Sequence, residues 1–389
     1  MARGSITQRG DSFRVRVDYY DLNGRRRQVS GTAPSFRKAE LLSTKLQAEV
    51  DRGTFLKPTK ITVEAFLHQW IDNYVVPSLS VSTAETYGFM IRHHVLPQLG
   101  NITLATLQPQ TIQNLYASMI KDGLSTATVR KTHNILHKSF ENAVKTGLIV
   151  RNPLVAVECP KLHSREMTTM NETDIHLLLD YAQSSPYYSL FYTLIFTGMR
   201  RSEALGLKWA DVDLLMLKIS INRSLTYLNI AREGSRILLK SPKTSKSRRF
   251  ISITPSNAIV LREYRQSQNK TRKSLGMALL ADGDFVFSTF DGNPYLPNSV
   301  THAWIKLVRR CGLPGRRLHD CRHSYATLLL RQNVHPSIVA NQLGHASVKT
   351  TLDIYSHSIP GLQETAAAKF DDIVIGKSVK SNFDNGAAL

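Results

Sequence analysis

The sequence predicts a multidomain, mainly α-helical protein with two small β-sheets. At 389 residues the chain is too long for one ordinary domain and suits two or three. Apolar residues recur at helical spacing through most of the chain, whereas the alternation typical of strands is confined to residues 5–30 and 217–254. Three parts are expected: a small sheet-plus-helix module, a helical bundle, and a larger, mostly helical domain with a small antiparallel sheet.

Residues 1–57 are expected to form the sheet-plus-helix module. Apolar and charged residues alternate over residues 12–20, which is the period of a half-buried strand. Residues 5–9 and 25–30 are predicted as its neighbouring strands, and Ser35 as the N-cap of the helix that follows.

Basic side chains gather on one side of this predicted sheet. They lie on the strand face opposite the apolar residues and in the adjoining turn, an arrangement that suits a sheet laid into a DNA groove. An ordinary solvated strand face is the alternative. The candidate DNA-binding residues here are Arg14, Arg16, Arg25, Arg26 and Arg27.

Residues 61–157 are predicted to form a four-helix bundle. The expected helices are 62–74, a second that begins at 82, 111–121 and 125–146. Ser82 to Glu85 is predicted to be a capping box that opens the second helix, and Pro97 with Gly100 to end it. The polar face of the fourth helix presents Arg130, Lys131 and Lys138.

Residues 158–170 are expected to be a linker, followed by a third domain at 171–360 and a tail at 361–389. Asn171 is predicted to cap a helix, and Gly198 to end a later one so that Arg200 begins the next. Glu203 follows Arg200 by three residues on that helix, so an ion pair between them is expected.

Strands are predicted after Trp209. Residues 217–222 and 236–240 are both expected to pair with 248–254, which leaves 241–247 as a hairpin tip. Lys243 and Lys246 lie on this tip.

Arg322 is the residue whose placement most demands an explanation. It lies in a predicted apolar helix, where a guanidinium is costly unless a carboxylate or a phosphate meets it. His319 precedes it by three residues and therefore shares its helix face. One face thus offers a positive fork together with a proton carrier, which indicates phosphate chemistry.

These residues resemble the tyrosine recombinases, or phage integrases. His319-Asp320-Cys321-Arg322-His323 and Leu343-Gly344-His345 fit the family's C-terminal motif, and Tyr355 follows His345 by 10 residues, near the family's usual interval. Residues 197–203 look like the first-arginine box, and 241–244 like the hairpin-lysine box. The resemblance covers about residues 60–360, and motifs in the same order are far more specific than any single one.

The resemblance implies a site-specific integrase that cuts and rejoins DNA through a 3′-phosphotyrosyl intermediate, integrating and excising a prophage or mobile element. It assigns 61–157 to core-site binding, where Arg130, Lys131 and Lys138 contact phosphates, and 171–360 to catalysis. By its pattern of strands and helix, 1–57 separately resembles the small arm-binding domain that many integrases carry ahead of their core. The implied catalytic residues are Arg200, Lys243, His319, Arg322, His345 and Tyr355, with Glu203 in support. Lys246 is an alternative to Lys243, and Asp320 and His323 are expected to be structural. No metal and no cofactor are expected.

Composition agrees with a nucleic-acid partner. The chain has 50 Lys and Arg against 30 Asp and Glu, a formal net charge of +20, and such an excess favours a polyanion. Three cysteines without metal-ligand spacing, and no apolar run near the roughly 20 residues of a membrane span, favour a reducing cytoplasm. The resemblance implies that this cytoplasm is that of a bacterial host. Expected partners are double-stranded DNA at core and arm sites, a homotetramer on that DNA, and an accessory bending or excision factor.

Several alternatives remain open from the sequence. The same tyrosine could serve resolution or a type IB topoisomerase reaction. His319 and His323, four apart, could hold a metal on one helix face, although Asp320 stands where the zinc hydrolase motif needs Glu. A DNA-binding regulator without catalysis is the third alternative.

Overall fold

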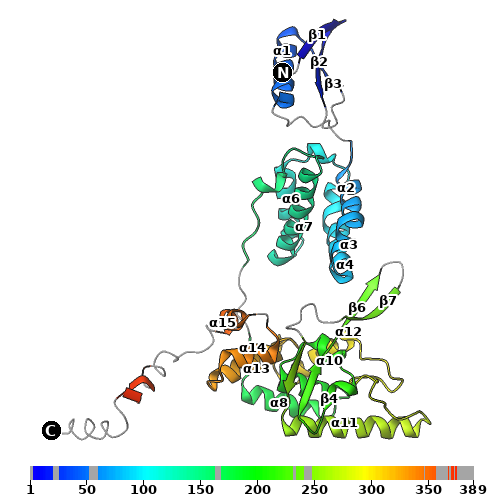
Figure 1. Ribbon diagram of the computed structural model, residues 1–389, viewed down its shortest axis with the longest axis vertical. Helices are drawn as coiled ribbons and strands as arrows, with labels where there is room; N and C mark the ends of the chain where they lie inside the picture. Colours follow the sequence, from blue (N-terminus) through cyan, green and yellow to red (C-terminus); the bar gives the residue numbers. More distant parts are fainter. Residues whose placement is uncertain are drawn as a thin grey trace, which may run out of the picture. The chain divides into compact units, whose positions relative to one another are not determined.

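The computed structural model describes residues 3–20, 26–51, 60–162, 168–230, 234–240, 248–345, 347–355, 367, 369–371 and 373–374. The chain divides into two compact units, 1–164 and 165–389. Helices make up most of both, and three small antiparallel sheets complete the described part, so the predicted fold class is confirmed (Figure 1).

The first unit begins with the predicted sheet-plus-helix module. Its strands, in the spatial order β1-β2-β3, are β1 (Arg3–Arg9), β2 (Ser12–Tyr20) and β3 (Arg26–Ala33), and α1 (Phe36–Asp51) packs on one face. Val15 and Val17 alternate into the contact with α1 and are fully buried. Ser35 caps α1 as predicted, its Oγ accepting from the backbone N–H of Lys38 at 3.4 Å.

The four predicted helices follow, and two of them contain a π-helical turn. The first comprises α2 (Val63–Trp70), a π turn (Ile71–Val75) and α3 (Val76–Ser78); the second comprises α4 (Val81–Met90), a π turn (Ile91–Val95) and α5 (Leu96–Leu99); the others are α6 (Pro109–Lys121) and α7 (Thr126–Lys145). Leu67, Leu115, Leu136 and Phe140 are fully buried between them.

Two details of the second helix were predicted wrongly. Ser80, not Ser82, is the N-cap, because its Oγ accepts from the N–H of Thr83 at 3.3 Å. Pro97 does not end the helix, which runs on to Leu99, whereas Gly100 is its C-cap as predicted. Proline usually breaks a helix because it lacks an N–H and its ring crowds the preceding turn. Here the preceding turn is a π turn, Ile91–Val95, which is wider than an α-helical turn and so accommodates the proline.

The helices of the second unit enclose one large core and a separate, smaller apolar cluster that contains Leu330 and Leu343. They are α8 (Glu172–Ala182), α9 (Tyr188–Thr197), α10 (Arg201–Leu205), α11 (Pro255–Ser274), α12 (Pro297–Arg310), α13 (Asp320–Arg331), α14 (Pro336–Leu343) and α15 (Val348–Tyr355). Phe191, Phe287 and Trp304 are fully buried in the large core. Asn171 caps α8 as predicted. Met170, at the end of the predicted linker, is also buried in this core.

The strands of this unit form two sheets where one was predicted. β4 (Val212–Asp213), β5 (Lys218–Ile221) and β8 (Arg249–Ser252) make the first, in which Ile219 pairs with Ile251. β7 (Gly234–Lys240) pairs not with β8, as predicted, but with β6 (Ser224–Ile230). The sequence did not predict β6. Its buried leucines, Leu225 and Leu228, are three residues apart and so do not follow the two-residue alternation of a half-buried strand.

In the part of the chain that the structure describes, no helix has the length and apolar character needed to cross a membrane.

Candidate active site

The ends of two helices surround Arg322. Helix α9 stops at Gly198, which is left-handed at φ 61°, and α14 stops at Gly344, left-handed at φ 68°. Arg322 Nη1 donates to the Gly198 carbonyl at 2.9 Å and Nη2 to the Leu343 carbonyl at 2.8 Å. The side chain is buried, and these two carbonyls lie at the negative ends of helix dipoles. The sequence predicted that a carboxylate or a phosphate meets this buried guanidinium. Two backbone carbonyls supply part of that stabilisation.

The C-terminal turn of α14 contacts two further arginines. Three successive carbonyls each accept from a different guanidinium: Gln342 from Arg249 Nε at 2.9 Å, Leu343 from Arg322 at 2.8 Å, and Gly344 from Arg200 Nη2 in a longer contact of 3.4 Å. This turn leads directly into His345. One backbone segment therefore positions three guanidinium groups relative to the Leu-Gly-His motif.

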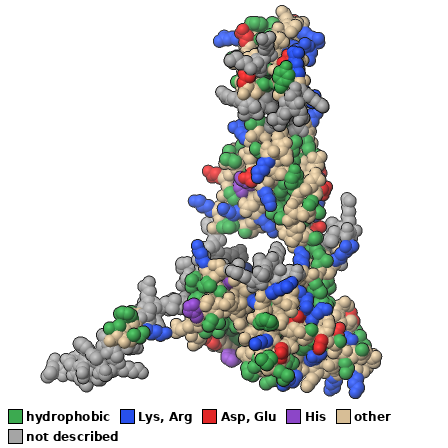
Figure 2. Space-filling view, viewed as in Figure 1, with side chains coloured by type: hydrophobic (Ala, Val, Ile, Leu, Met, Phe, Trp, Pro, Cys, Tyr) green, Lys and Arg blue, Asp and Glu red, His purple; other side chains and the backbone are tan. Residues whose placement is uncertain are grey.

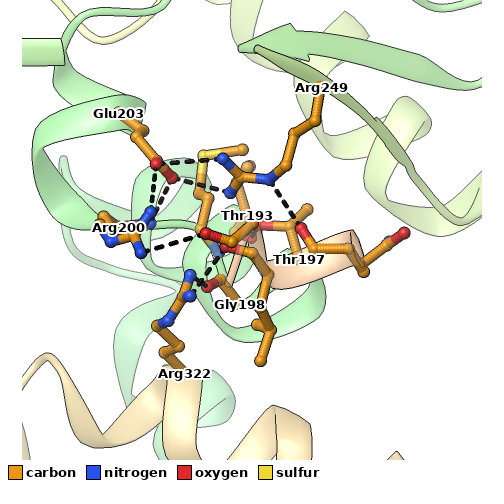
Figure 3. A network of polar contacts seen from close by, with 11 residues as sticks. Thr193, Thr197, Gly198, Arg200, Glu203, Arg249 and Arg322 are labelled. Carbon is orange, nitrogen blue, oxygen red and sulfur yellow. Dashed lines mark hydrogen bonds and ion pairs between the residues drawn. The ribbon is translucent and has the colours of Figure 1, made fainter. Parts of the chain in front are cut away.

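Glu203 lies between two of these arginines (Figure 3). Arg200 Nη1 donates to Oε1 at 2.8 Å, which is the predicted ion pair, and Arg249 donates to both carboxylate oxygens, at 3.1 and 2.9 Å. Burial would raise the pKa of Glu203, but the hydrogen bonds and charge of Arg249, followed by those of Arg200, outweigh it and lower the pKa. The carboxylate therefore stays ionised.

The two arginines on Glu203 differ in exposure. The Arg200 side chain is 40% exposed and that of Arg249 only 7%. Arg200 lines a cavity of about 460 Å³, whose other polar lining residues include Arg201, Arg317, His319 and Arg322. This concentration of cations around one hollow suits an anionic ligand.

Three histidines adjoin the arginines and are held neutral. Burial, then the charges of Arg322 and Arg200, lower the pKa of His345 to about 4. Burial, then His319, lower that of His323 to about 4, and burial with Arg322 lowers that of His319. A neutral imidazole can accept a proton at physiological pH.

His345 is oriented by a residue of α15. Its Nδ1 lies 2.8 Å from Oγ1 of Thr351, whose side chain is fully buried. The hydroxyl therefore restrains the ring and influences which nitrogen carries the proton.

Asp320 and His323 have local partners. Asp320 is buried and accepts from the N–H of Arg317 at 2.6 Å and from its Nη2 at 3.0 Å. The His323 ring lies edge to face with that of His319, with 4.8 Å between the ring centroids. Over the described ranges, His, Cys, Asp and Glu form no group of three placed to hold a metal ion.

The site residues fall into three groups. Arg200, Glu203, His319, Arg322 and His345 lie in the described structure around the ends of α9 and α14. Tyr355 is the last residue of α15, but its side chain lies outside the described structure. Lys243 and Lys246 fall entirely outside it.

Sequence reasoning missed Arg249 and Thr351. A signal existed for Arg249, because it lies two residues before the fully buried Ile251 on β8 and so shares its strand face. Thr351 gave none, since its contact with His345 exists only once α15 packs against α14.

The side chains of the first unit that are expected to contact DNA differ in their exposure and in their hydrogen-bond partners. Arg14 and Arg16 alternate with the buried Val15 and Val17 along β2, while Arg26 pairs with Asp18 at 2.8 Å. Arg130 Nη1 donates to the carbonyl of Pro160 at 3.0 Å. Arg27, Lys131 and Lys138 are exposed, and Arg25 lies outside the described residues.

Lys and Arg side chains outnumber Asp and Glu on the face seen in Figure 2.

Comparisons with known proteins agree on one family. Residues 168–360 match the Phage integrase family, and 62–120 match the Phage integrase, N-terminal SAM-like domain. A Tyrosine recombinase XerC-like protein of Caldanaerobacter subterraneus is 27% identical over 87% of this chain and 92% of its own. The ICEBs1 integrase of Bacillus subtilis is 25% identical over 92% of this chain and 96% of its own.

A solved structure shares the fold. The Tn1549 transposon integrase, in complex with a circular intermediate DNA, superposes with a TM-score of 0.67 at 21% identity, covering 81% of this chain and 100% of that one. The matches span both the helical bundle and the unit that contains the arginine cluster. The chain therefore belongs to the phage integrase family, the tyrosine recombinases that cleave and transfer DNA strands.

Proposed function

We propose that this recombinase integrates and excises a mobile element or prophage through a phosphotyrosyl intermediate formed by Tyr355. The observation that supports this most is that Arg200 and Arg322 line one cavity with His319. Each guanidinium keeps its charge at any physiological pH and presents a planar fork suited to phosphate oxygens. The function assigned here rests on that cluster and on the family.

The proposed chemistry begins with attack on a backbone phosphate. The Tyr355 oxygen forms a bond to phosphorus as the bond from phosphorus to the 5′-oxygen breaks, leaving a 3′-phosphotyrosyl ester and a 5′-hydroxyl. Arg200 and Arg322 stabilise the charge on the non-bridging oxygens of the transition state. His345 adds a hydrogen bond to the same phosphate.

Two proton transfers accompany this step. A phenol with an ordinary pKa near 10 is mostly protonated at neutral pH, so a base must accept its proton. His319 suits the role because its lowered pKa keeps it neutral. Lys243 donates a proton to the leaving 5′-oxygen. Attack by the 5′-hydroxyl of a second strand on the ester then reverses the reaction and rejoins the DNA.

The partners we propose follow from this chemistry. Exchange between two duplexes needs four cleavages, so four protomers assemble on double-stranded DNA. In a crystal structure, a lambda integrase tetramer is bound to a Holliday junction, which supports the proposal. The helical bundle contacts core sites through Arg130, Lys131 and Lys138, and an accessory bending or excision factor sets the direction.

The N-terminal sheet is proposed to bind arm-type sites. Its β2 arginines, Arg14 and Arg16, lie on the face opposite α1, with Arg25, Arg26 and Arg27 nearby in sequence. Deleting residues 1–57 should preserve cleavage of a core site and impair integration. An integration yield equal to that of the full chain would overturn the arm-site assignment.

The decisive test is capture of the covalent intermediate. The protein is incubated, with EDTA present, with nicked duplexes tiled across the DNA that flanks its gene, and denaturant-resistant adducts are mapped by peptide analysis. We expect an adduct on Tyr355 that Tyr355→Phe abolishes while DNA binding persists. Binding without any adduct would favour a regulator, and relaxation of plasmid without strand exchange would favour a topoisomerase.

The acid is tested separately. Lys243→Ala should slow cleavage of ordinary DNA but not of a substrate with a 5′-thio leaving group, which needs no proton. Failure of this rescue would move the role to Lys246.

A further inference from the structure

We propose that Arg249 is a positioning residue for strand cleavage, holding Glu203 and the end of α14 so that Arg200 and His345 are correctly placed for the phosphate. This inference rests on the function proposed for the same site. It adds a third arginine to the site, in a role distinct from that of the two that face the cavity.

The contacts of Arg249 join three distant segments. It comes from β8, yet it donates to both oxygens of Glu203, 46 residues before it, at 3.1 and 2.9 Å. It also donates to the carbonyl of Gln342, 93 residues after it, at 2.9 Å. Three directional bonds from one planar group fix the carboxylate and the last turn of α14 relative to each other.

The position of Arg249 argues against direct contact with substrate, because Arg200 and Arg322 line the cavity and Arg249 does not. Only 7% of the Arg249 side chain is exposed, against 40% for Arg200 on the same carboxylate. A Cβ built on Gly344 would lie 2.7 Å from Arg249 Nη1, so the backbone packs closely against the guanidinium. Arg249 therefore acts through its neighbours.

The charge of Arg249 leaves the Arg200 guanidinium less tightly engaged by Glu203. Glu203 is shared between two guanidinium groups. Without Arg249, the buried carboxylate would be neutralised by Arg200 alone, which would draw that side chain away from a phosphate and leave Gln342 without its side-chain donor. Arg249 thus leaves Arg200 available to bind the ligand.

Arg249 also lies close in sequence to the proposed acid. It follows Lys243 by six residues, a span of at most about 20 Å of extended chain.

The test compares three variants with the wild-type protein. Arg249→Met removes the charge and the fork, and Arg249→Lys keeps the charge only. Arg223→Met is the matched control, because it breaks another ion pair of a buried carboxylate, Asp211, away from the site. Measurements are DNA affinity, the first-order rate of adduct formation and thermal unfolding.

We expect Arg249→Met to bind DNA normally and to form the adduct more slowly, by on the order of 10- to 100-fold, the range typical of residues that orient metal ligands. Arg249→Lys should be intermediate. Arg223→Met should lose stability but keep the wild-type rate. If Arg249→Met cleaves at the wild-type rate, or if rates in all three variants simply follow stability, the inference is wrong.

A second measurement separates this inference from the proposed function. The imidazole of His345 is titrated by NMR in the free protein, where Arg322, Arg200, Arg249 and His323 are the ionisable groups acting on it. Arg249→Met should raise its pKa and Arg249→Lys should not. An unchanged pKa in Arg249→Met would overturn the placement of Arg249, whereas absence of any adduct in the wild-type protein would refute the proposed function instead.

Discussion

The carbonyl oxygen of Leu343 accepts a hydrogen bond from Nη2 of Arg322 at 2.8 Å. The donor is a buried cation on α13, and the acceptor is the final residue of α14. Since Gly198 supplies the second carbonyl at 2.9 Å, this cation is held by two helix ends. Backbone acceptors neutralise less charge than a carboxylate would, so the guanidinium retains its attraction for a phosphate.

Removing this cation should cost both stability and activity. Arg322→Met leaves two buried carbonyls without their donor, at about 1–3 kcal/mol each, which corresponds to a fall in Tm of several degrees. Cleavage should fall to background. Thermal unfolding and adduct assays check both, with the exposed Arg309→Met of α12 as control. A fully stable Arg322→Met would show that the carbonyls are satisfied in another way.

The left-handed Gly344 should resist substitution. In Gly344→Ala the new Cβ would lie 2.7 Å from Arg249 Nη1 at φ 68°, so both strain and a displaced guanidinium are expected. Gly276→Ala is the matched control, because φ is 67° but nothing lies within 4 Å. The control should lose only the left-handed penalty of about 1–2 kcal/mol. Chemical denaturation of both variants measures the difference, and equal losses would contradict the packing argument.

Thr351 should matter for chemistry more than for folding. Thr351→Val keeps the buried shape but removes the hydroxyl 2.8 Å from His345 Nδ1, so we expect about 1 kcal/mol lost and slower adduct formation. Thr327→Val is the control, since its buried hydroxyl has no partner among the described residues and its loss should be neutral or stabilising. Equal cleavage rates in the two variants would remove the orienting role.

Acid should destabilise the second unit before it protonates the site. His345 and His323 have a pKa of about 4 when folded, against an ordinary value of 6.5. Between these values the unfolded chain binds more protons, so stability is highest above pH 6.5 and declines as the pH falls toward 4. Urea unfolding at a series of pH values measures this. His323→Gln should flatten the decline, and an unchanged slope would contradict the lowered pKa.

The sequence predicted the elements well because they depend on local patterns. Alternation identified β2, apolar spacing identified the four helices, and the left-handed Gly198 ended α9 as expected. The errors arose where a neighbour decided the outcome. Pro97 ends a regular α-helix but not one with a π turn before it, and β7 found its partner in β6 rather than β8.

What the sequence by itself determined is the set of chemical groups and their order: Arg200 at a helix start, His319 and Arg322 on one helix face, His345 after a glycine, and Tyr355 beyond. Spacing within a helix fixes such relations. Only the tertiary structure decided that Glu203 is shared with Arg249, that three successive carbonyls at the end of α14 accept from three arginines, and that Thr351 restrains His345. The contacts of Arg249 join segments 46 and 93 residues apart, which packing of the core brings together. Thr351 lies only six residues from His345, but the two side chains meet because α15 packs against α14.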